Sequence, residues 1–231
     1  MTGALRTNRE LLLPCAAPYA VYVATASFAG GLSRELDYAL RIALTGLALT
    51  VLWPRLLPLR GPRSAAASLA WGGLAGVLGL GLWIAALTPF ARPEDAESWS
   101  AAAFLLRLAA AVLLVPLFEE QLLRGWVMGV ATQWERLRRA GHPDAFDETF
   151  ARRSLLELEP TAWTLGAVAI SSAAFALGHT TTEWPAALLF GALMAGLRGA
   201  RGDLLSCVAA HAVANLGLGL YVWITGAWAL W

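Results

Sequence analysis

The sequence predicts an all-α, polytopic integral membrane protein that forms one helix bundle over residues 1–231. The chain is 58% hydrophobic and 14% charged, whereas roughly 25% of the residues in an ordinary soluble domain are charged. Its eleven tryptophans suit the aromatic belts that lie at the two membrane interfaces. Long apolar runs recur along the whole chain, so a lipid environment is expected throughout.

A helix that crosses the hydrocarbon core needs about 20 apolar residues. The apolar segments are about 11–30, 37–53, 65–89, 101–131, 161–179, 184–197 and 204–228. The polar stretch over about 133–160 predicts a short cytoplasmic helix or loop. Segment 184–197 would extend only about 21 Å as a helix, which is too short to cross alone. We therefore expect 161–179 and 184–197 to form a hairpin that turns within the membrane.

The beginning of the chain has charged residues before its first apolar run, as a signal peptide does. Further apolar segments follow directly, so we interpret this run as the first membrane helix. Cys15 and Cys207 both lie in apolar segments and do not indicate a disulfide framework.

The distribution of arginine predicts the orientation. All seventeen residues counted as Lys or Arg are arginines. If the N-terminus lies in the cytoplasm, thirteen of them are cytoplasmic and the acidic loop 90–99 is outside, as the positive-inside rule requires. A net charge of +1 gives no basic surface of the kind that binds nucleic acid, so nucleic acid is not an expected partner.

Small residues spaced four apart predict close helix packing. The two pairs are Gly72 with Gly76 and Gly125 with Gly129, and such pairs let helix backbones approach each other.

The stretch FEEQLLRGW places ionisable residues inside an apolar segment, where they are costly and therefore candidates for function. Glu120 and Arg124 are four residues apart and are expected to form an ion pair on one helix face. Glu119 is rotated by about 100° from Glu120 and is free to face a different cavity. The pattern predicts a supporting role for Glu120 and Arg124, and a reactive role for Glu119.

Two later segments each carry a histidine. HAVAN places His211 and Asn215 one turn apart, so both offer hydrogen-bond donors to one oxyanion. FALGH places Phe175 beside His179 on one face. A glutamate and a histidine together can activate water, which predicts peptide hydrolysis without a covalent intermediate and without a cofactor.

Other interpretations of these residues remain open. Glu119, His179 and His211 also make a known zinc ligand set, which leaves a zinc-dependent hydrolase as an alternative. The same buried polar groups could simply stabilise the bundle, and Cys207 with His211 is a geometrically possible dyad. His142 lies in the polar stretch and is expected to be solvated. Arg41 and Arg107 are expected to extend toward an interface.

In this order, EEQLLRG, FALGH and HAVAN match the motifs EExxxR, FxxxH and HxxxN. The chain thereby resembles the CPBP or Abi family of glutamic-type intramembrane proteases, which includes the type II CAAX prenyl endopeptidases. Such proteins commonly have eight membrane helices, whereas the sequence shows seven apolar segments, so we expect a bundle of seven to eight transmembrane helices. The resemblance also implies a cavity facing the cytoplasm. It also implies that Glu119 activates water with His179, that His211 and Asn215 form the oxyanion site, and that Glu120, Arg124 and Phe175 support them.

The motifs lie in residues 101–231, the expected catalytic core, while residues 1–100 are helices without a motif. The implied substrate is a membrane-associated protein or peptide, with or without a lipid. The ending NLGLGLYVWITGAWALW also resembles a bacterial subset linked to exosortase systems, so we expect a multi-pass protein of the bacterial inner membrane. The alternative is a non-catalytic membrane partner, such as a bacteriocin-immunity-type protein; a transporter or channel is less favoured because no inverted halves are evident.

Overall fold

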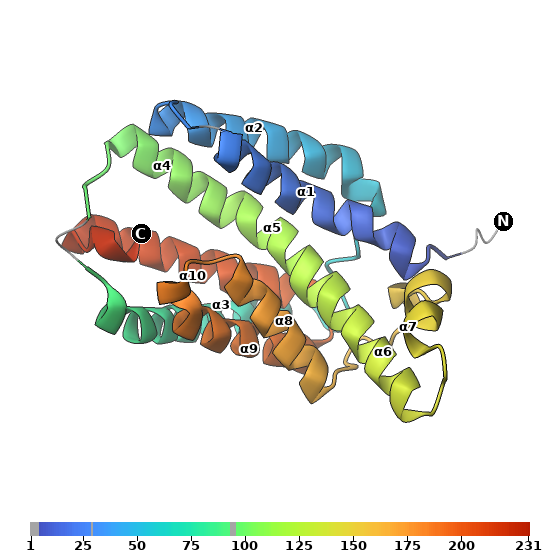
Figure 1. The fold of residues 1–231 in the computed structure, drawn as a ribbon. Helices are drawn as coiled ribbons and strands as arrows, with labels where there is room; N and C mark the ends of the chain where they lie inside the picture. The colour runs from blue at the N-terminus through green and yellow to red at the C-terminus, as the bar shows by residue number, and fades with distance from the viewer. Residues whose placement is uncertain (1–4, 29, 93–95) are drawn as a thin grey trace.

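A computed structural model describes residues 5–28, 30–92 and 96–231, and these form an all-helical bundle (Figure 1). The longer helices are α1 (Asn8–Phe28), α2 (Arg34–Leu52), α3 (Ala65–Leu87), α8 (Leu165–Leu177), α9 (Trp184–Arg201), α10 (Leu204–Thr225), and the continuous helix of α4, α5 and α6 over Ala101–Arg139. Within the described residues no strand is present. This confirms the predicted fold class.

The helix Ala101–Arg139 contains two π-helical segments. The segment η4 (Ala110–Leu114) separates α4 (Ala101–Ala109) from α5 (Val115–Glu120), and η5 (Gln121–Val127) separates α5 from α6 (Met128–Arg139). Each π segment changes the angular spacing of the side chains, and such segments often occur at functional sites. Glu119 and Glu120 lie in the short α-helical stretch between the two.

Short polar residues set the starts of the helices. The side chains of Ser33, Ser64, Ser100, Thr164 and Asp203 each accept a hydrogen bond from a backbone N–H in the first turn of the helix that follows, which satisfies a donor that has no partner within the helix. At the ends of α9 and α10, Gly202 and Gly226 have φ values of 71° and 72°, a left-handed conformation that glycine adopts without strain.

The predicted apolar segments all form helices. Among the described residues, five helices are long and apolar enough to cross a membrane: Asn8–Phe28, Arg34–Arg55, Ala65–Phe90, Ala101–Arg139 and Leu204–Thr225. Residues 140–160 contain only short pieces, α7 (Ala145–Asp147), the π segment η6 (Glu148–Arg152) and the 3-10 turn η7 (Leu155–Glu157). The polar stretch therefore does not supply an eighth membrane helix.

The predicted hairpin is formed by α8 and α9, joined by the 3-10 turn η8 (Thr181–Glu183). Helix α8 has only 13 residues, and Figure 1 shows the hairpin turning back before it reaches the far end of the bundle. The turn is held by a capping box in which Thr180 and Glu183 bond each other's backbone N–H groups. The hairpin thus brings His179, just before this turn, into the interior of the bundle.

Helices α3 and α10 pack closely through glycine, as predicted. A Cβ atom added to Gly72 would lie 2.6 Å from the carbonyl oxygen of Ser206, and one added to Gly76 would lie 2.5 Å from that of Ala210. Gly125 and Gly129 instead face the side chains of Leu57 and Leu155, so this second pair does not bring two helix backbones together. The first pair therefore fixes the position of α10, which carries His211.

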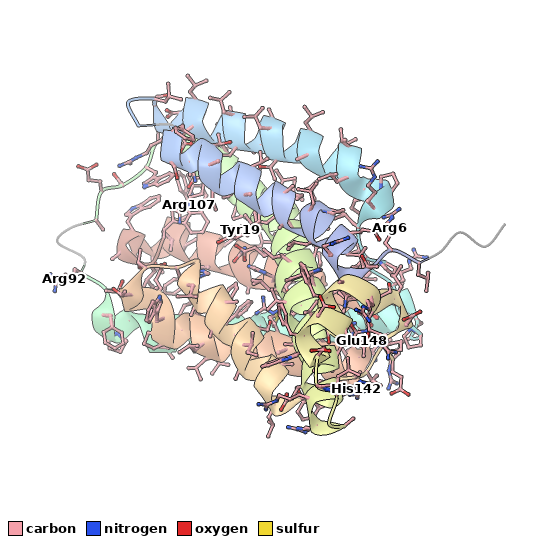
Figure 2. All side chains as sticks on the ribbon, turned by 45° about the vertical axis from the view of Figure 1, so that its right-hand side comes forward. Arg6, Tyr19, Arg92, Arg107, His142 and Glu148 are labelled. Atoms are coloured by element: carbon pink, nitrogen blue, oxygen red, sulfur yellow. The ribbon has the colours of Figure 1, made fainter. Side chains whose placement is uncertain are left out.

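The two ends of the bundle differ in charge. One end carries most of the arginines and includes the start of α1, the end of α6 and the start of α10 (Figure 1). In Figure 2, Arg6, His142 and Glu148 mark this arginine-rich end, whereas Arg92 and Arg107 lie toward the opposite end.

Candidate active site

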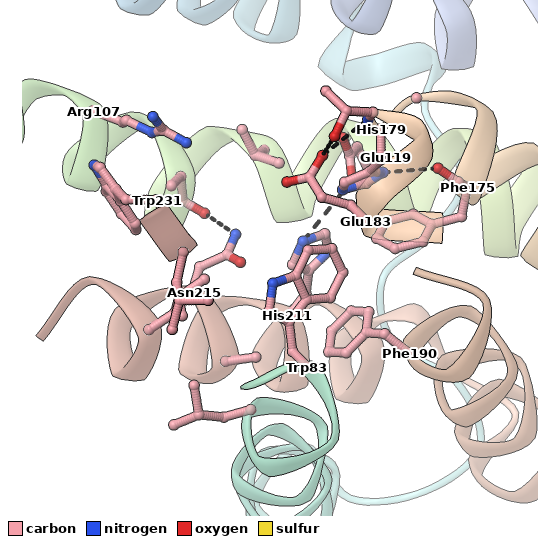
Figure 3. Close-up of a pocket in the computed structure, with 18 of the residues that line it drawn as sticks. Trp83, Arg107, Glu119, Phe175, His179, Glu183, Phe190, His211, Asn215 and Trp231 are labelled. Atoms are coloured by element: carbon pink, nitrogen blue, oxygen red, sulfur yellow. Dashed lines mark hydrogen bonds and ion pairs between the residues drawn. The ribbon is translucent and has the colours of Figure 1, made fainter. Parts of the chain in front are cut away.

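A cavity of about 350 Å³ lies between the hairpin, the helix Ala101–Arg139 and helices α1, α2, α3 and α10. The predicted residues Glu119, His179, His211 and Asn215 all line it, together with Phe175 (Figure 3). Three sequence segments that are far apart thus meet at one space, as expected.

Glu119 and Glu120 have different surroundings. The Glu120 side chain is fully buried, and its Oε1 atom lies 3.2 Å from an Arg124 nitrogen. Glu119 lines the cavity with 14% of its side chain exposed. The predicted ion pair and the predicted separation of the two carboxylates are therefore both present.

The His211 ring lies between the two carboxylates. Its Nδ1 atom lies 2.8 Å from Oε1 of Glu120, and its Nε2 atom lies 3.9 Å from Oε2 of Glu119. An ionised carboxylate only accepts hydrogen bonds, so Nδ1 carries the proton and donates to Glu120. Nε2 then faces the cavity and Glu119. Glu120 consequently orients His211 as well as binding Arg124, a contact that the helix geometry of FEEQLLRGW alone does not reveal.

His179 is held by its own helix. Its Nδ1 atom lies 2.9 Å from the carbonyl oxygen of Phe175, so Nδ1 donates and the Nε2 lone pair is left free. The ring of Phe175 lies 4.6 Å from the His179 ring and 4.7 Å from the Arg124 guanidinium. Phe175 therefore packs between the histidine and the buried ion pair, which agrees with a supporting role.

Asn215 lies at the cavity but already has a protein partner. Its Nδ2 atom donates to the carbonyl oxygen of Ala111 at 2.7 Å, and Ala111 lies in the π segment η4, where the regular α-helical pairing is interrupted. This bond ties α10 to the helix that carries Glu119. One N–H of Asn215 remains for a ligand.

Several residues at the site were not predicted from sequence. The Trp83 ring lies 5.3 Å from the His179 ring, and the Phe190 ring lies 5.3 Å from the His211 ring. Trp83 and Phe190 both belong to apolar runs without any motif, so no sequence signal marked them.

Arg41 and Arg107 also line the cavity. The sequence-based expectation that they simply extend toward an interface is incomplete, because both guanidinium groups contact aromatic rings: that of Arg41 lies 4.7 Å from Tyr38 and that of Arg107 lies 4.5 Å from Trp231.

The alternative site chemistries receive less geometric support. The Cys207 thiol is buried and lies 3.5 Å from the carbonyl oxygen of Met194, and Cys207 does not line the cavity. His142 is exposed. Across residues 5–28, 30–92 and 96–231, no group of three His, Cys, Asp or Glu side chains is arranged to hold a metal ion. The proposed zinc ligands Glu119, His179 and His211 share the cavity without forming such a group.

The cavity lies in the half of the bundle away from the arginine-rich end. It is lined by the last part of α1 and α3, the first part of α2, the first half of the helix Ala101–Arg139, and the residues Leu230 and Trp231. A cytoplasm-facing cavity and a cytoplasmic N-terminus were both expected. Because the start of α1 lies at the arginine-rich end, a cytoplasmic N-terminus would place the cavity in the half of the bundle away from the cytoplasm.

The fold and the cavity define a multi-pass membrane protein with carboxylates and imidazoles sheltered inside a helix bundle. A family model described as type II CAAX prenyl endopeptidase Rce1-like matches residues 101–217, just over half of the chain. The protein belongs to this family, which is a family of proteases. No curated protein and no solved structure is significantly similar to it.

Proposed function

We propose that this protein is an intramembrane endopeptidase that hydrolyses a peptide bond with water activated by Glu119. The observation that supports this most directly is the gap of 3.9 Å between Oε2 of Glu119 and Nε2 of His211. This distance is too long for a hydrogen bond, so neither atom uses its hydrogen-bonding capacity on the other, and both can bond a molecule in the cavity. A water and a substrate carbonyl beside the gap would reach both.

In the proposed reaction, the Glu119 carboxylate takes a proton from water, and the resulting hydroxide adds to the carbonyl carbon of the peptide bond. His179 assists by accepting a hydrogen bond from that water at its free Nε2 atom. The C–N bond then breaks, and Glu119 returns the proton to the leaving amine. No covalent bond to the protein forms at any step.

His211 is proposed to stabilise the oxyanion that develops on the carbonyl oxygen. Its Nδ1–H is held by Glu120 at 2.8 Å, which directs Nε2 toward the cavity, where it donates to the oxyanion when it carries a proton. A preorganised donor of this kind contributes about 10²–10³ in kcat at an oxyanion site. Asn215 is proposed either to donate its remaining N–H to the oxyanion or, through its bond to Ala111, to hold the two helices at their present spacing.

The substrate is proposed to be a peptide segment that enters the cavity from within or beside the bilayer. The lining is aromatic near the histidines, with Trp83, Phe175 and Phe190, which suits an apolar segment. CAAX-like specificity and a lipid on the substrate are proposed on the family description alone.

The test is a pair of isosteric variants measured on a peptide library by mass spectrometry. Glu119→Gln should lower kcat by at least about 10³ and leave the thermal unfolding temperature near that of the wild type. The matched control is Glu97→Gln, since Glu97 is exposed and far from Glu119 in the chain. Cleavage by Glu119→Gln at a near wild-type rate would disprove the proposal.

The same assay separates the two alternatives. Activity that is lost on chelation and restored by zinc would replace the metal-free mechanism with the zinc-dependent one. A cellular phenotype retained by Glu119→Gln, together with loss of peptidase activity, would instead favour a non-catalytic membrane partner.

A further inference from the structure

One end of the cavity is cationic, unlike the end that holds Glu119. Arg41 and Arg107 both line it. Arg41 forms an ion pair with Asp37, one turn away on α2. In the described part of the chain, neither an ion pair nor a hydrogen bond engages the guanidinium of Arg107. The cavity therefore presents a guanidinium whose N–H donors are available.

Arg107 is held in place by two indole rings. Its guanidinium carbon lies 5.0 Å from the centre of the Trp99 ring and 4.5 Å from that of the Trp231 ring. These cation–π contacts fix the position of the group but accept none of its N–H donors in ordinary hydrogen bonds. The Nε1–H of Trp231 is also buried without a partner among the described residues.

Such an arrangement suits an anion, and a carboxylate matches the planar guanidinium best. Arg107 and Glu119 lie on one continuous helix, twelve residues apart, which corresponds to about 18 Å along its axis. An extended peptide covers that length with about five residues, and fewer are needed because the Arg107 side chain itself has length. A peptide bond at Glu119 and a carboxylate at Arg107 are thus compatible with one short segment.

We propose that Arg107, supported by Trp99 and Trp231, is a specificity-determining residue that binds a carboxylate of the substrate within about five residues of the scissile bond. This inference rests on the proposed function, but the binding of a carboxylate by Arg107 does not itself require cleavage. The carboxylate is either the free C-terminus of the substrate or an Asp or Glu side chain near the cleavage site.

Binding is measured with the cleavage-deficient variant Glu119→Gln in phosphatidylcholine nanodiscs. The probes are fluorescent ten-residue apolar peptides in matched pairs: a C-terminal acid against its amide, and internal Asp against Asn at successive positions. One pair should show tighter binding of the carboxylate form by about tenfold to a hundredfold, the range for a hydrogen bond to a charged group. The pair that responds identifies the source of the carboxylate.

Adding Arg107→Gln to Glu119→Gln should abolish this preference. The matched control is Arg138→Gln, because Arg138 lies on the same continuous helix with its guanidinium 5.3 Å from the Trp134 ring, but at the arginine-rich end. The control should retain the preference. Equal binding within every pair, or a preference that survives Arg107→Gln, overturns the proposal.

A further measurement distinguishes a lipid ligand. If Arg107 binds a lipid phosphate instead, Arg107→Gln will reduce retention of phosphatidylglycerol in native mass spectrometry without changing peptide discrimination, and the proposal fails. Cleavage of the same peptides by the wild-type protein is recorded in parallel. Absence of cleavage with a preserved carboxylate preference would count against the proposed function and leave the assignment of Arg107 standing.

Discussion

Residues 101–217, which match the family, and residues 5–90, which do not, build different parts of the same cavity. The matched region supplies every ionisable group at the proposed reaction centre, from Glu119 to His211. The N-terminal region supplies walls, with Tyr22, Tyr38, Arg41, Leu80 and Trp83. The difference teaches that the proposed reaction chemistry comes from the matched region alone, whereas both regions shape the cavity.

The largest expected effect comes from Glu120→Gln in the matched region. This change leaves Arg124 buried without its counter-ion and removes the carboxylate that orients His211. Loss of one partner of a buried ion pair costs about 3–5 kcal/mol, so both stability and activity should fall sharply. Glu119→Gln should lower activity alone. Chemical unfolding of the two variants in detergent checks the contrast, and equal stabilities would show that the two carboxylates are not divided in this way.

A smaller effect is expected in the N-terminal region from Gly76→Val. The new side chain would collide with the α10 backbone at Ala210 and displace the helix that carries His211. Overpacking of this kind costs about 1–3 kcal/mol, with a parallel loss of kcat. The matched control is Gly73→Val, since nothing lies within 4 Å of a Cβ atom there. A similar loss of thermal stability in both variants would argue against close packing of α3 and α10.

A still smaller effect is expected from Trp83→Phe. The indole contacts the His179 and Phe190 rings, so its replacement should alter KM for bulky apolar peptides by about 10-fold or less, the scale of roughly 1 kcal/mol of lost contact. The value of kcat for small peptides should be unchanged. Steady-state kinetics on the two peptide classes would show it, and a loss confined to kcat would move Trp83 from the walls into the reaction centre.

The smallest effect on activity belongs to single cysteines that report orientation. Arg92→Cys marks the cavity end of the bundle, and Arg138→Cys marks the arginine-rich end. With a cytoplasmic N-terminus, a membrane-impermeant maleimide should label only Arg92→Cys in intact bacterial cells. Cys15 and Cys207 are buried and should give little background. Labelling of Arg138→Cys alone would reverse the predicted orientation and turn the cavity toward the cytoplasm.

Much of this structure could be predicted from sequence because the relevant signals are local. Apolar length predicted the helices, and residue spacing separated Glu119 from Glu120. The hairpin was predicted from the shortness of segment 184–197, but that helix extends to Arg201 and α8, with 13 residues, is the shorter one. The bond between Glu120 and His211 joins residues 91 positions apart, and helix spacing carries no information about it. The position of Arg107 at the cavity likewise involves Trp231, which is distant in the sequence and contacts Arg107 only in the folded protein.

The π segment η4 sets the phase between the two ends of one helix. A π turn holds one more residue than an α turn, so a change of Ala110–Leu114 to α-helical pairing at constant length would rotate Glu119 by roughly the turn of one residue, about 100°, relative to Arg107. The same change would remove the carbonyl geometry that Asn215 now uses. A switch of this segment from π to α pairing, with no change to any motif, is therefore enough to uncouple the proposed cleavage site from the proposed carboxylate-binding site.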